Sequence, residues 1–552
     1  MTFRYSNKYQ LYLFLGLLIA AVPGFLTDPY SINFFDEPYQ ILNALEWKNA
    51  VYSPLASWLG HLLGNMVEWK YVAFRYLASS LHLAAMFVCG FFALNFSKYP
   101  KLTIIVASLA TLFMLLDHSD QYLYNWDSWS APVVSIAIVT LLSYIFRPCN
   151  YKIFILSLTA AVATLLRLPN ASIIPLLMAL LAVILYIKKQ PLRKIIAIPV
   201  IFLSITLLIL WLIFICMYGS IDGYLQFLNQ NEVNDHSLNH VIIPFFKQFI
   251  FAGCFSVLTY FAYKLLSLPK LKGICYGAVF IVITVFLYIA LTYTTGEAFG
   301  SDKQAILGIN LLIIAILSLH AYKRYDYIRM AAVISLFLLT AVPAVGSNGG
   351  YMKALAWPVL PILVSYGTET KISTSLKSIS IAWILAFLAF CITRFYSKSF
   401  FDESLVSQDF KFKETGTVLD GMHTDAKRGE LLLELNRQLK PYIEKGYRII
   451  PLRYGNKYMW EYMTLTWNKY QRHKFSNLEA FDDEEYVHSI ENDLHTSQSP
   501  CLIVYMYPSG ELVYSPEYSE SNPVEDTAML DMLGRNASCV LTTANYSLWT
   551  YP

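Results

Sequence analysis

Two adjacent carboxylates, Asp36 and Glu37, are the residues of this chain best suited to chemistry. They lie in the run N-F-F-D-E-P-Y, which follows the first strongly apolar segment. Acidic side chains at the boundary of a membrane lose hydration and must find cations, a metal ion or a substrate to offset the cost. The pair is therefore a candidate active site, although an Asp-Glu pair in a wet loop can also be simply solvated.

A second acidic and aromatic cluster lies in the run D-H-S-D-Q-Y-L-Y-N-W-D-S-W, which contains Asp117, His118, Asp120 and Asp127. Its Trp and Tyr residues suit the headgroup level of a membrane, and their rings could also stack on sugars. The acids and the histidine could ligate a divalent cation or position a hydroxyl nucleophile. Their spacing is not diagnostic of a metal site.

Three cations complete the set: Arg75, Arg167 in the turn R-L-P-N, and Lys353 in the run G-G-Y-M-K-A-L-A-W-P. A guanidinium is well shaped to bind a phosphate. An arginine at a membrane boundary can instead bind no ligand and simply extend its charged group into the water. Carboxylates and cations at one lipid-water interface suggest an anionic, lipid-linked substrate.

The composition predicts an α-helical polytopic membrane protein. Of the 552 residues, 56% are hydrophobic and 14% are charged, and the mean hydropathy is +0.46. Soluble proteins carry about 25% charged residues. Apolar runs long enough to cross a bilayer predict about thirteen spans: 10–26, 72–94, 102–116, 131–146, 153–167, 171–187, 195–217, 242–266, 274–293, 304–320, 330–346, 355–367 and 379–393.

Basic residues predict that the N-terminus is cytoplasmic, because Lys and Arg are retained on that side in short loops. Lys188, Lys189 and Arg193 lie in one such predicted inner loop, and before residue 394 all acids except Asp326 and Glu369 fall in predicted outer loops. An odd number of spans then places residues 394–552 outside. We expect a membrane domain over 1–393 and a soluble extracytoplasmic domain over 394–552, and we expect the first span to be retained rather than cleaved as a signal peptide.

The outer domain is predicted to be a small α/β fold. A helix is expected around Lys427 to Lys445, and strands in Y-R-I-I-P-L-R-Y, C-L-I-V-Y-M-Y and E-L-V-Y-S, the last two forming a hairpin. Its cysteines, Cys501 and Cys539, could form a disulfide in an oxidising compartment or remain two buried thiols.

The long first outer loop also carries a predicted helix. Apolar residues recur at three- and four-residue spacing after Pro54, which indicates an amphipathic helix lying in the membrane interface and holding the Asp36 segment near it. Such a helix could equally serve only to pack on neighbouring spans.

The order of these features resembles the GT-C glycosyltransferases, membrane enzymes that take sugars from polyprenyl phosphate carriers, such as the aminoarabinose transferases and the protein O-mannosyltransferases. F-F-D-E-P-Y follows the first span, A-F-R-Y-L opens the second, N-W-D-S-W-S-A-P precedes the fourth, and T-L-L-R-L-P-N and Y-M-K-A-L-A-W-P-V-L-P come later. The resemblance covers roughly residues 1–370, no single motif in it is specific, and Lys353 stands where the family often has Arg.

The resemblance implies an inverting transfer of a sugar from a polyprenyl-phosphate-linked donor to a lipid or glycan acceptor, with Asp36 as the catalytic base. Glu37 and Asp127 would be supporting groups, and Arg75, Arg167 and Lys353 would bind the donor phosphate. Some relatives hold a divalent metal cation and others do not, so the metal requirement stays open. The implied location is a bacterial inner membrane with a periplasmic C-terminal domain, and we expect no nucleic-acid partner.

Other functions remain open. A transporter or flippase of lipid-linked sugars would also need many spans and outer cations, although transporters tend to place ionisable groups near the bilayer midplane, and the predicted spans are nearly free of acids. A polymerase or ligase of lipid-linked saccharides would use a large later loop, for which 219–240 is available. A non-catalytic membrane scaffold would not need the acids of the outer loops.

Overall fold

The structure is a computed structural model, and its chain forms two compact units. The first contains residues 1–28, 46–59 and 76–393, and the second contains 29–45, 60–75 and 394–552. The residues it describes are 7–32, 36–49, 53–94, 100–116, 126–220, 321–345, 404–452, 483–507 and 525–552, with scattered positions in 311–319 and 384–396.

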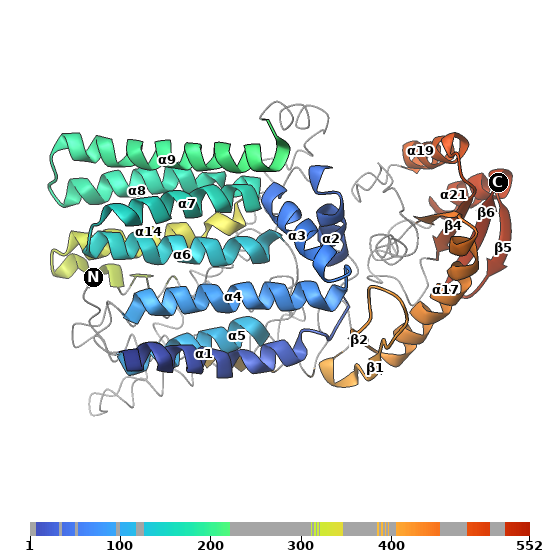
Figure 1. The fold of residues 1–552 in the computed structure, drawn as a ribbon, viewed down its shortest axis with the longest axis horizontal. Coiled ribbons are helices and arrows are strands. Elements are labelled where there is room, and N and C mark those ends of the chain that lie inside the picture. Colours follow the sequence, from blue (N-terminus) through green and yellow to red (C-terminus); the bar gives the residue numbers. More distant parts are fainter. Residues whose placement is uncertain are drawn as a thin grey trace. The chain divides into compact units, whose positions relative to one another are not determined.

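The described part of the first unit is helical. In Figure 1 its helices run alongside one another: α1 (Asn7–Thr27), α4 (Tyr71–Leu94), α5 (Pro100–Leu116), α6 (Trp126–Phe146), α7 (Asn150–Leu166), α8 (Ile173–Ile187), α9 (Leu192–Tyr218) and α14 (Tyr327–Thr340). These confirm as helices the spans predicted between 10 and 217, and the span at 330–346 as far as Thr340. The predictions at 242–266, 274–293, 355–367 and most of 304–320 and 379–393 lie outside the described residues.

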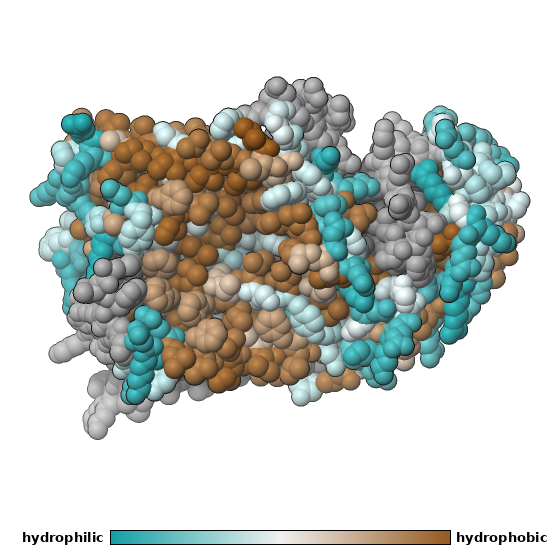
Figure 2. Space-filling model, viewed as in Figure 1, coloured by the Kyte–Doolittle hydropathy of each residue, from teal (hydrophilic) through white to brown (hydrophobic). Residues whose placement is uncertain are grey.

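Five of the described helical stretches are long and apolar enough to cross a membrane: Asn7–Thr27, Tyr71–Leu94, Trp129–Phe146, Leu168–Ile187 and Leu192–Tyr218. Figure 2 shows apolar side chains covering much of the visible surface of these helices. Large side chains such as Ile19 and Leu26 on α1 and Ile196 on α9 are more than half exposed. A continuous apolar surface of this kind suits contact with lipid rather than water, so the chain is an integral membrane protein.

Small residues allow the membrane helices to approach closely, as is common where lipid offers no hydrophobic drive for association. A Cβ added at Gly24 of α1 would lie 2.4 Å from the Leu115 Cβ of α5. Elsewhere, α6 packs on α7 and α14, and α9 packs on α7 and α8. Buried residues such as Ile138, Leu177 and Leu339 form their shared core.

Two short helices precede α4. The predicted helix after Pro54 is confirmed as α3 (Pro54–Met66). A second helix, α2 (Asp36–Leu45), begins at the acidic pair itself, and the short 3-10 helix η1 (Trp47–Asn49) follows it. Acidic residues at a helix N-terminus interact favourably with the exposed amide groups there. Ile41, Leu42 and Ala44 bury the apolar side of α2.

The second unit contains a four-stranded sheet with helices. The strands are β3 (Arg448–Leu452), β4 (Cys501–Met506), β6 (Tyr546–Tyr551) and β5 (Ser538–Thr542), paired in that order. Only the β3–β4 pair is parallel. The helices are α17 (Ala426–Glu444), α19 (Asp483–Thr496) and α21 (Glu525–Asn536), and side chains of the last two share a core with β3 and β4.

The sheet also bears on the two cysteines of this unit. Cys501 lies on β4 and Cys539 on β5, and β6 separates these strands. Strands are spaced by about 4.8 Å, so alternate strands lie about 10 Å apart. A disulfide needs Cα atoms within about 7 Å. The disulfide between Cys501 and Cys539, which the sequence left open, is therefore excluded by this sheet, and both cysteines are free thiols.

The segment before α17, residues 404–425, is here called the clamp segment. It contains the 3-10 helix η5 (Leu405–Ser407) and the short antiparallel pair β1 (Phe410–Lys411) and β2 (His423–Thr424). The carboxylate of Asp425 then caps α17 by accepting a hydrogen bond from the Arg428 amide at 2.8 Å.

Candidate functional site

Glu37 and Arg75 form a buried ion pair in the second unit. The Arg75 Nη2 lies 2.8 Å from the Glu37 Oε2, and Arg75 Nε donates to Oε1 at 3.0 Å and to Oε2 at 3.2 Å. The two side chains are 1% and 0% exposed. Charged groups withdrawn from water to this extent must be paired and hydrogen-bonded. The pair therefore fastens the first turn of α2 to the start of α4.

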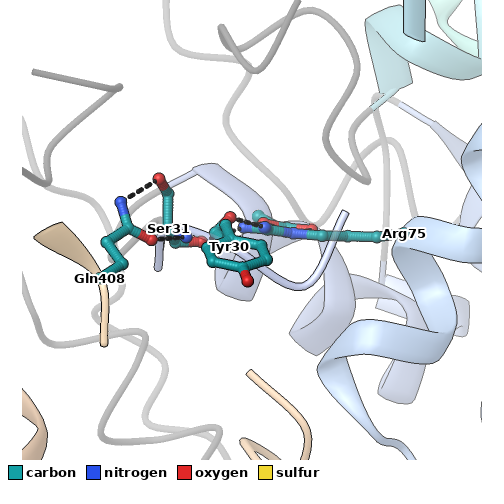
Figure 3. Close-up of polar contacts among 5 residues, drawn as sticks. Tyr30, Ser31, Arg75 and Gln408 are labelled. Atoms are coloured by element: carbon teal, nitrogen blue, oxygen red, sulfur yellow. Dashed lines mark hydrogen bonds and ion pairs between the residues drawn. The ribbon is translucent and has the colours of Figure 1, made fainter. Parts of the chain in front are cut away.

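Arg75 also bonds to the backbone between α1 and α2. Its Nη1 donates to the Tyr30 carbonyl at 2.6 Å, and its Nη2 donates to the Ser31 carbonyl at 2.7 Å. Figure 3 shows the guanidinium directed at this turn. Ser31 has φ +64°, a left-handed conformation that an L-residue other than Asn or Asp seldom adopts. Strain of this kind persists only where the surroundings hold it.

The clamp segment holds Ser31 in this conformation through hydrogen bonds with Gln408. The Ser31 amide donates to Gln408 Oε1 at 2.5 Å, and Gln408 Nε2 donates to the Ser31 hydroxyl at 2.8 Å (Figure 3). The His423 amide donates to the Pro29 carbonyl at 2.8 Å, and the rings of His423 and Tyr30 stack at 4.4 Å with 20° between their planes. The turn after α1 is therefore held by Arg75 on one side and by the clamp segment on another.

Electrostatics around His423 favour its neutral form. Burial lowers the pKa of His423 below its usual value, and the positive charges of Lys411 and Lys413 lower it further, against the opposing effect of a hydrogen bond to the Gln408 backbone. A neutral imidazole stacks on Tyr30 without placing an unpaired charge against the turn.

Arg167 belongs to the first unit, where it has backbone partners too. It lies in extended conformation between α7 and the 3-10 helix η2 (Leu168–Ser172). Its Nη1 donates to the carbonyls of Pro343 at 2.8 Å and Val345 at 2.9 Å. Arg167 thus ties the turn after α7 to the segment that follows α14 and leads towards Lys353.

The structure places the remaining predicted site residues only in part. Asp36 is the first residue of α2, next to Glu37, and Asp127 is the second residue of α6, but their side chains lie outside what the structure describes. Lys353 and the acidic residues of the second outer loop before Trp126 lie outside the described residues altogether. Of the predicted site residues, the described contacts bring together Glu37 and Arg75.

Two further polar residues were missed by sequence reasoning. Asp28, at the end of α1, is 5% exposed and accepts a hydrogen bond from the Ser79 hydroxyl of α4 at 3.0 Å. Its position directly after a span was a usable signal. Gln408 gave no signal, because it lies 377 residues from its partner Ser31. As for metals, no group of three or more His, Cys, Asp and Glu side chains suited to a metal ion occurs among the described residues.

No protein-family model matches this chain, and no curated protein matches its sequence. Solved structures do match. The oligosaccharyltransferase of Archaeoglobus fulgidus, solved with Zn and sulfate, aligns over 81% of this chain with 10% identity and a TM-score of 0.45, and the chain spans 61% of its length. ArnT from Cupriavidus metallidurans in the apo state aligns over 97% of both chains with 11% identity and a TM-score of 0.44.

Proposed function

We propose that this chain is an integral membrane glycosyltransferase of the GT-C type, which moves a sugar from a polyprenyl-phosphate-linked donor to a lipid or glycan acceptor on the outer face of the membrane. One observation carries the proposal: Glu37, the residue next to Asp36 in the first turn of α2, is held to the membrane helix α4 by its buried ion pair with Arg75. A carboxylate that must act as a base needs such fixed support.

In the proposed reaction Asp36 accepts the proton of the acceptor's nucleophilic group as that group attacks the anomeric carbon. The bond from this carbon to the donor phosphate oxygen breaks on the opposite side, so the configuration inverts and the polyprenyl phosphate leaves. Negative charge near the reacting sugar favours an oxocarbenium-like transition state. Glu37, held by Arg75, fixes the first turn of α2, where Asp36 lies. Asp127, at the start of α6, is proposed as a second supporting acid.

The leaving phosphate requires cations. Arg75 donates to two backbone carbonyls and to Glu37, and the Arg167 Nη1 donates to two backbone carbonyls, so a phosphate would compete with these acceptors for both guanidiniums. Leaving such buried acceptors without donors would cost about 1–3 kcal/mol each. We therefore propose Lys353 as the main phosphate ligand, while Arg75 and Arg167 each hold the backbone of their own unit. A divalent metal ion at the phosphate would be compatible with this assignment.

The proposed topology follows the charge pattern. The N-terminus faces the cytoplasm, thirteen spans follow, and the unit that contains residues 394–552 lies outside, in the periplasm if the membrane is a bacterial inner membrane. All proposed site residues then face the same side as Asp36.

The test is sugar transfer from a radiolabelled polyprenyl phosphate donor pool by membranes that contain the wild type, Asp36→Asn or the matched control Asp531→Asn, whose side chain is exposed on α21. General-base catalysis contributes about 10²- to 10⁴-fold. We expect Asp36→Asn to lose transfer by this factor and Asp531→Asn to retain it. Equal transfer by the wild type and Asp36→Asn would remove Asp36 from the mechanism. If the wild type transfers nothing with any donor of this class, the transporter function becomes the better explanation.

A further inference from the structure

We propose that Gln408 is a positioning residue for the catalytic carboxylate, so that the clamp segment of residues 404–425 completes the active site formed by the first outer loop. This inference rests on the proposed function and extends it. It assigns a role in catalysis to a residue beyond the predicted spans, in the part of the chain that the resemblance to GT-C enzymes does not reach.

The side chain of Gln408 is matched to Ser31. Both residues are buried, at 3% and 5% exposure. One side-chain amide satisfies two groups of Ser31, because its oxygen accepts from the Ser31 N–H and its nitrogen donates to the Ser31 hydroxyl. The two bonds hold Ser31 at φ +64°. An L-residue in this region is disfavoured by a factor of about 5 to 30 relative to its ordinary conformations.

The conformation of Ser31 determines where two carbonyl groups point. The carbonyls of Tyr30 and Ser31 both accept hydrogen bonds from the Arg75 guanidinium, and the same guanidinium holds Glu37. If Ser31 relaxed to negative φ, the peptide planes on either side of it would rotate and these acceptors would be re-aimed. Arg75 would then shift with Glu37, and with it the first turn of α2, where Asp36 lies.

Gln408 does not alone attach the clamp segment to its surroundings. The His423 amide bonds to the Pro29 carbonyl, and the Tyr71 amide bonds to the Val418 carbonyl at 2.9 Å. The rings of Tyr30 and His423 also stack. We therefore expect the segment to stay docked when Gln408 is replaced, while the conformation of Ser31 is no longer enforced.

The test compares Gln408→Leu with the matched control Gln438→Leu, because Gln438 is a glutamine of the same unit whose exposed amide bonds to Glu434. We expect Gln408→Leu to lower kcat by about 5- to 30-fold, the factor by which the left-handed conformation is disfavoured, with little change in KM for the donor. Gln438→Leu is expected to behave as the wild type.

A rescue separates positioning from a structural role. Glycine adopts positive φ without penalty, so Ser31→Gly in the Gln408→Leu background is expected to recover most of the lost kcat. A simple loss of docking would not respond to this change. Wild-type kcat in Gln408→Leu overturns the proposal, and so does a loss of kcat that Ser31→Gly does not restore.

Hydrogen exchange over residues 29–37 gives a readout that needs no substrate. We expect the Ser31 amide to exchange faster in Gln408→Leu than in the wild type, with the Tyr71 amide unchanged. Unchanged exchange at Ser31 overturns the proposal. If the wild type shows no transfer but exchange at Ser31 rises as expected, the positioning contact stands and the proposed function fails.

Discussion

Removing the Glu37 carboxylate is expected to destabilise the second unit strongly. In Glu37→Leu the guanidinium of Arg75 stays buried, with an exposed fraction of 1%, and keeps the carbonyls of Tyr30 and Ser31 but loses its countercharge. A buried ion pair that loses one partner costs about 3–5 kcal/mol. The carboxylate here accepts three contacts of 3.2 Å or less from Arg75, so we expect a loss in that range.

Removal of both charges is expected to cost less than the sum of the single changes. In Glu37→Leu with Arg75→Met no charge remains buried, and apolar replacement of a buried pair is often nearly neutral. The two carbonyls that lose Arg75 as a donor still cost about 1–3 kcal/mol each. The double variant should therefore lose about 2–6 kcal/mol, which is less than the two single changes added together, because Arg75→Met alone leaves the same two carbonyls without a donor and also leaves the Glu37 carboxylate buried and unpaired.

The assay is denaturant unfolding in detergent micelles, followed by tryptophan fluorescence, for the wild type, both single variants and the double variant. The exposed pair formed by Lys70 and Glu68 in the same unit is the control, with side chains 45% and 81% exposed. Glu68→Leu should change stability by less than about 1 kcal/mol. If Glu37→Leu costs no more than Glu68→Leu, or if the two single costs simply add, the reasoning about this pair is refuted.

Two further predictions concern other contacts. The pKa of His423 is lowered in the folded state, so the unfolded chain binds more protons between that lowered pKa and the ordinary value of about 6.5. Docking of the clamp segment should therefore weaken as pH falls below about 6.5. His423→Phe, which keeps a ring on Tyr30, should flatten the pH dependence of the thermal unfolding midpoint, and a slope identical to that of the wild type would contradict this prediction. Gly24→Ala should lower the free energy of unfolding by about 1–3 kcal/mol, because the added Cβ meets Leu115 at the α1–α5 contact. Gly534→Ala on α21, where a Cβ meets nothing within 4 Å, should be neutral or stabilising by up to about 1 kcal/mol. Equal effects of the two substitutions on the free energy of unfolding would contradict this prediction.

The membrane helices were the most predictable part of the fold. A helix such as α9 must satisfy its own backbone within lipid and expose apolar side chains to it, so length and hydropathy suffice to locate it. The helix α3 was also predictable, since its apolar residues recur at helical spacing after Pro54. These elements are specified by local composition and need no knowledge of their neighbours.

The helix α2 was not predicted, because its stability comes from tertiary contacts. It has ten residues, fewer than an isolated helix needs in water. Gln40 and Asn43 are buried together with its apolar residues, which blurs the apolar periodicity. The acidic pair could be singled out from its place beside a span, but the ion pair could not: Glu37 and Arg75 lie 38 residues apart, and nothing local to either residue names the other.

The two arginines show why a cation beside an apolar span is an ambiguous signal. Segments that connect membrane helices leave carbonyl groups without partners at the edge of the lipid, and a guanidinium with five donors in a fixed fork can satisfy several of them at once. Arg75 and Arg167 each do so, at Tyr30 and Ser31 and at Pro343 and Val345. A lysine has three donors on one rotating point charge and is less suited to bridging fixed carbonyls. The same chemistry that makes Arg a good phosphate ligand therefore also makes it well suited to holding loops in place.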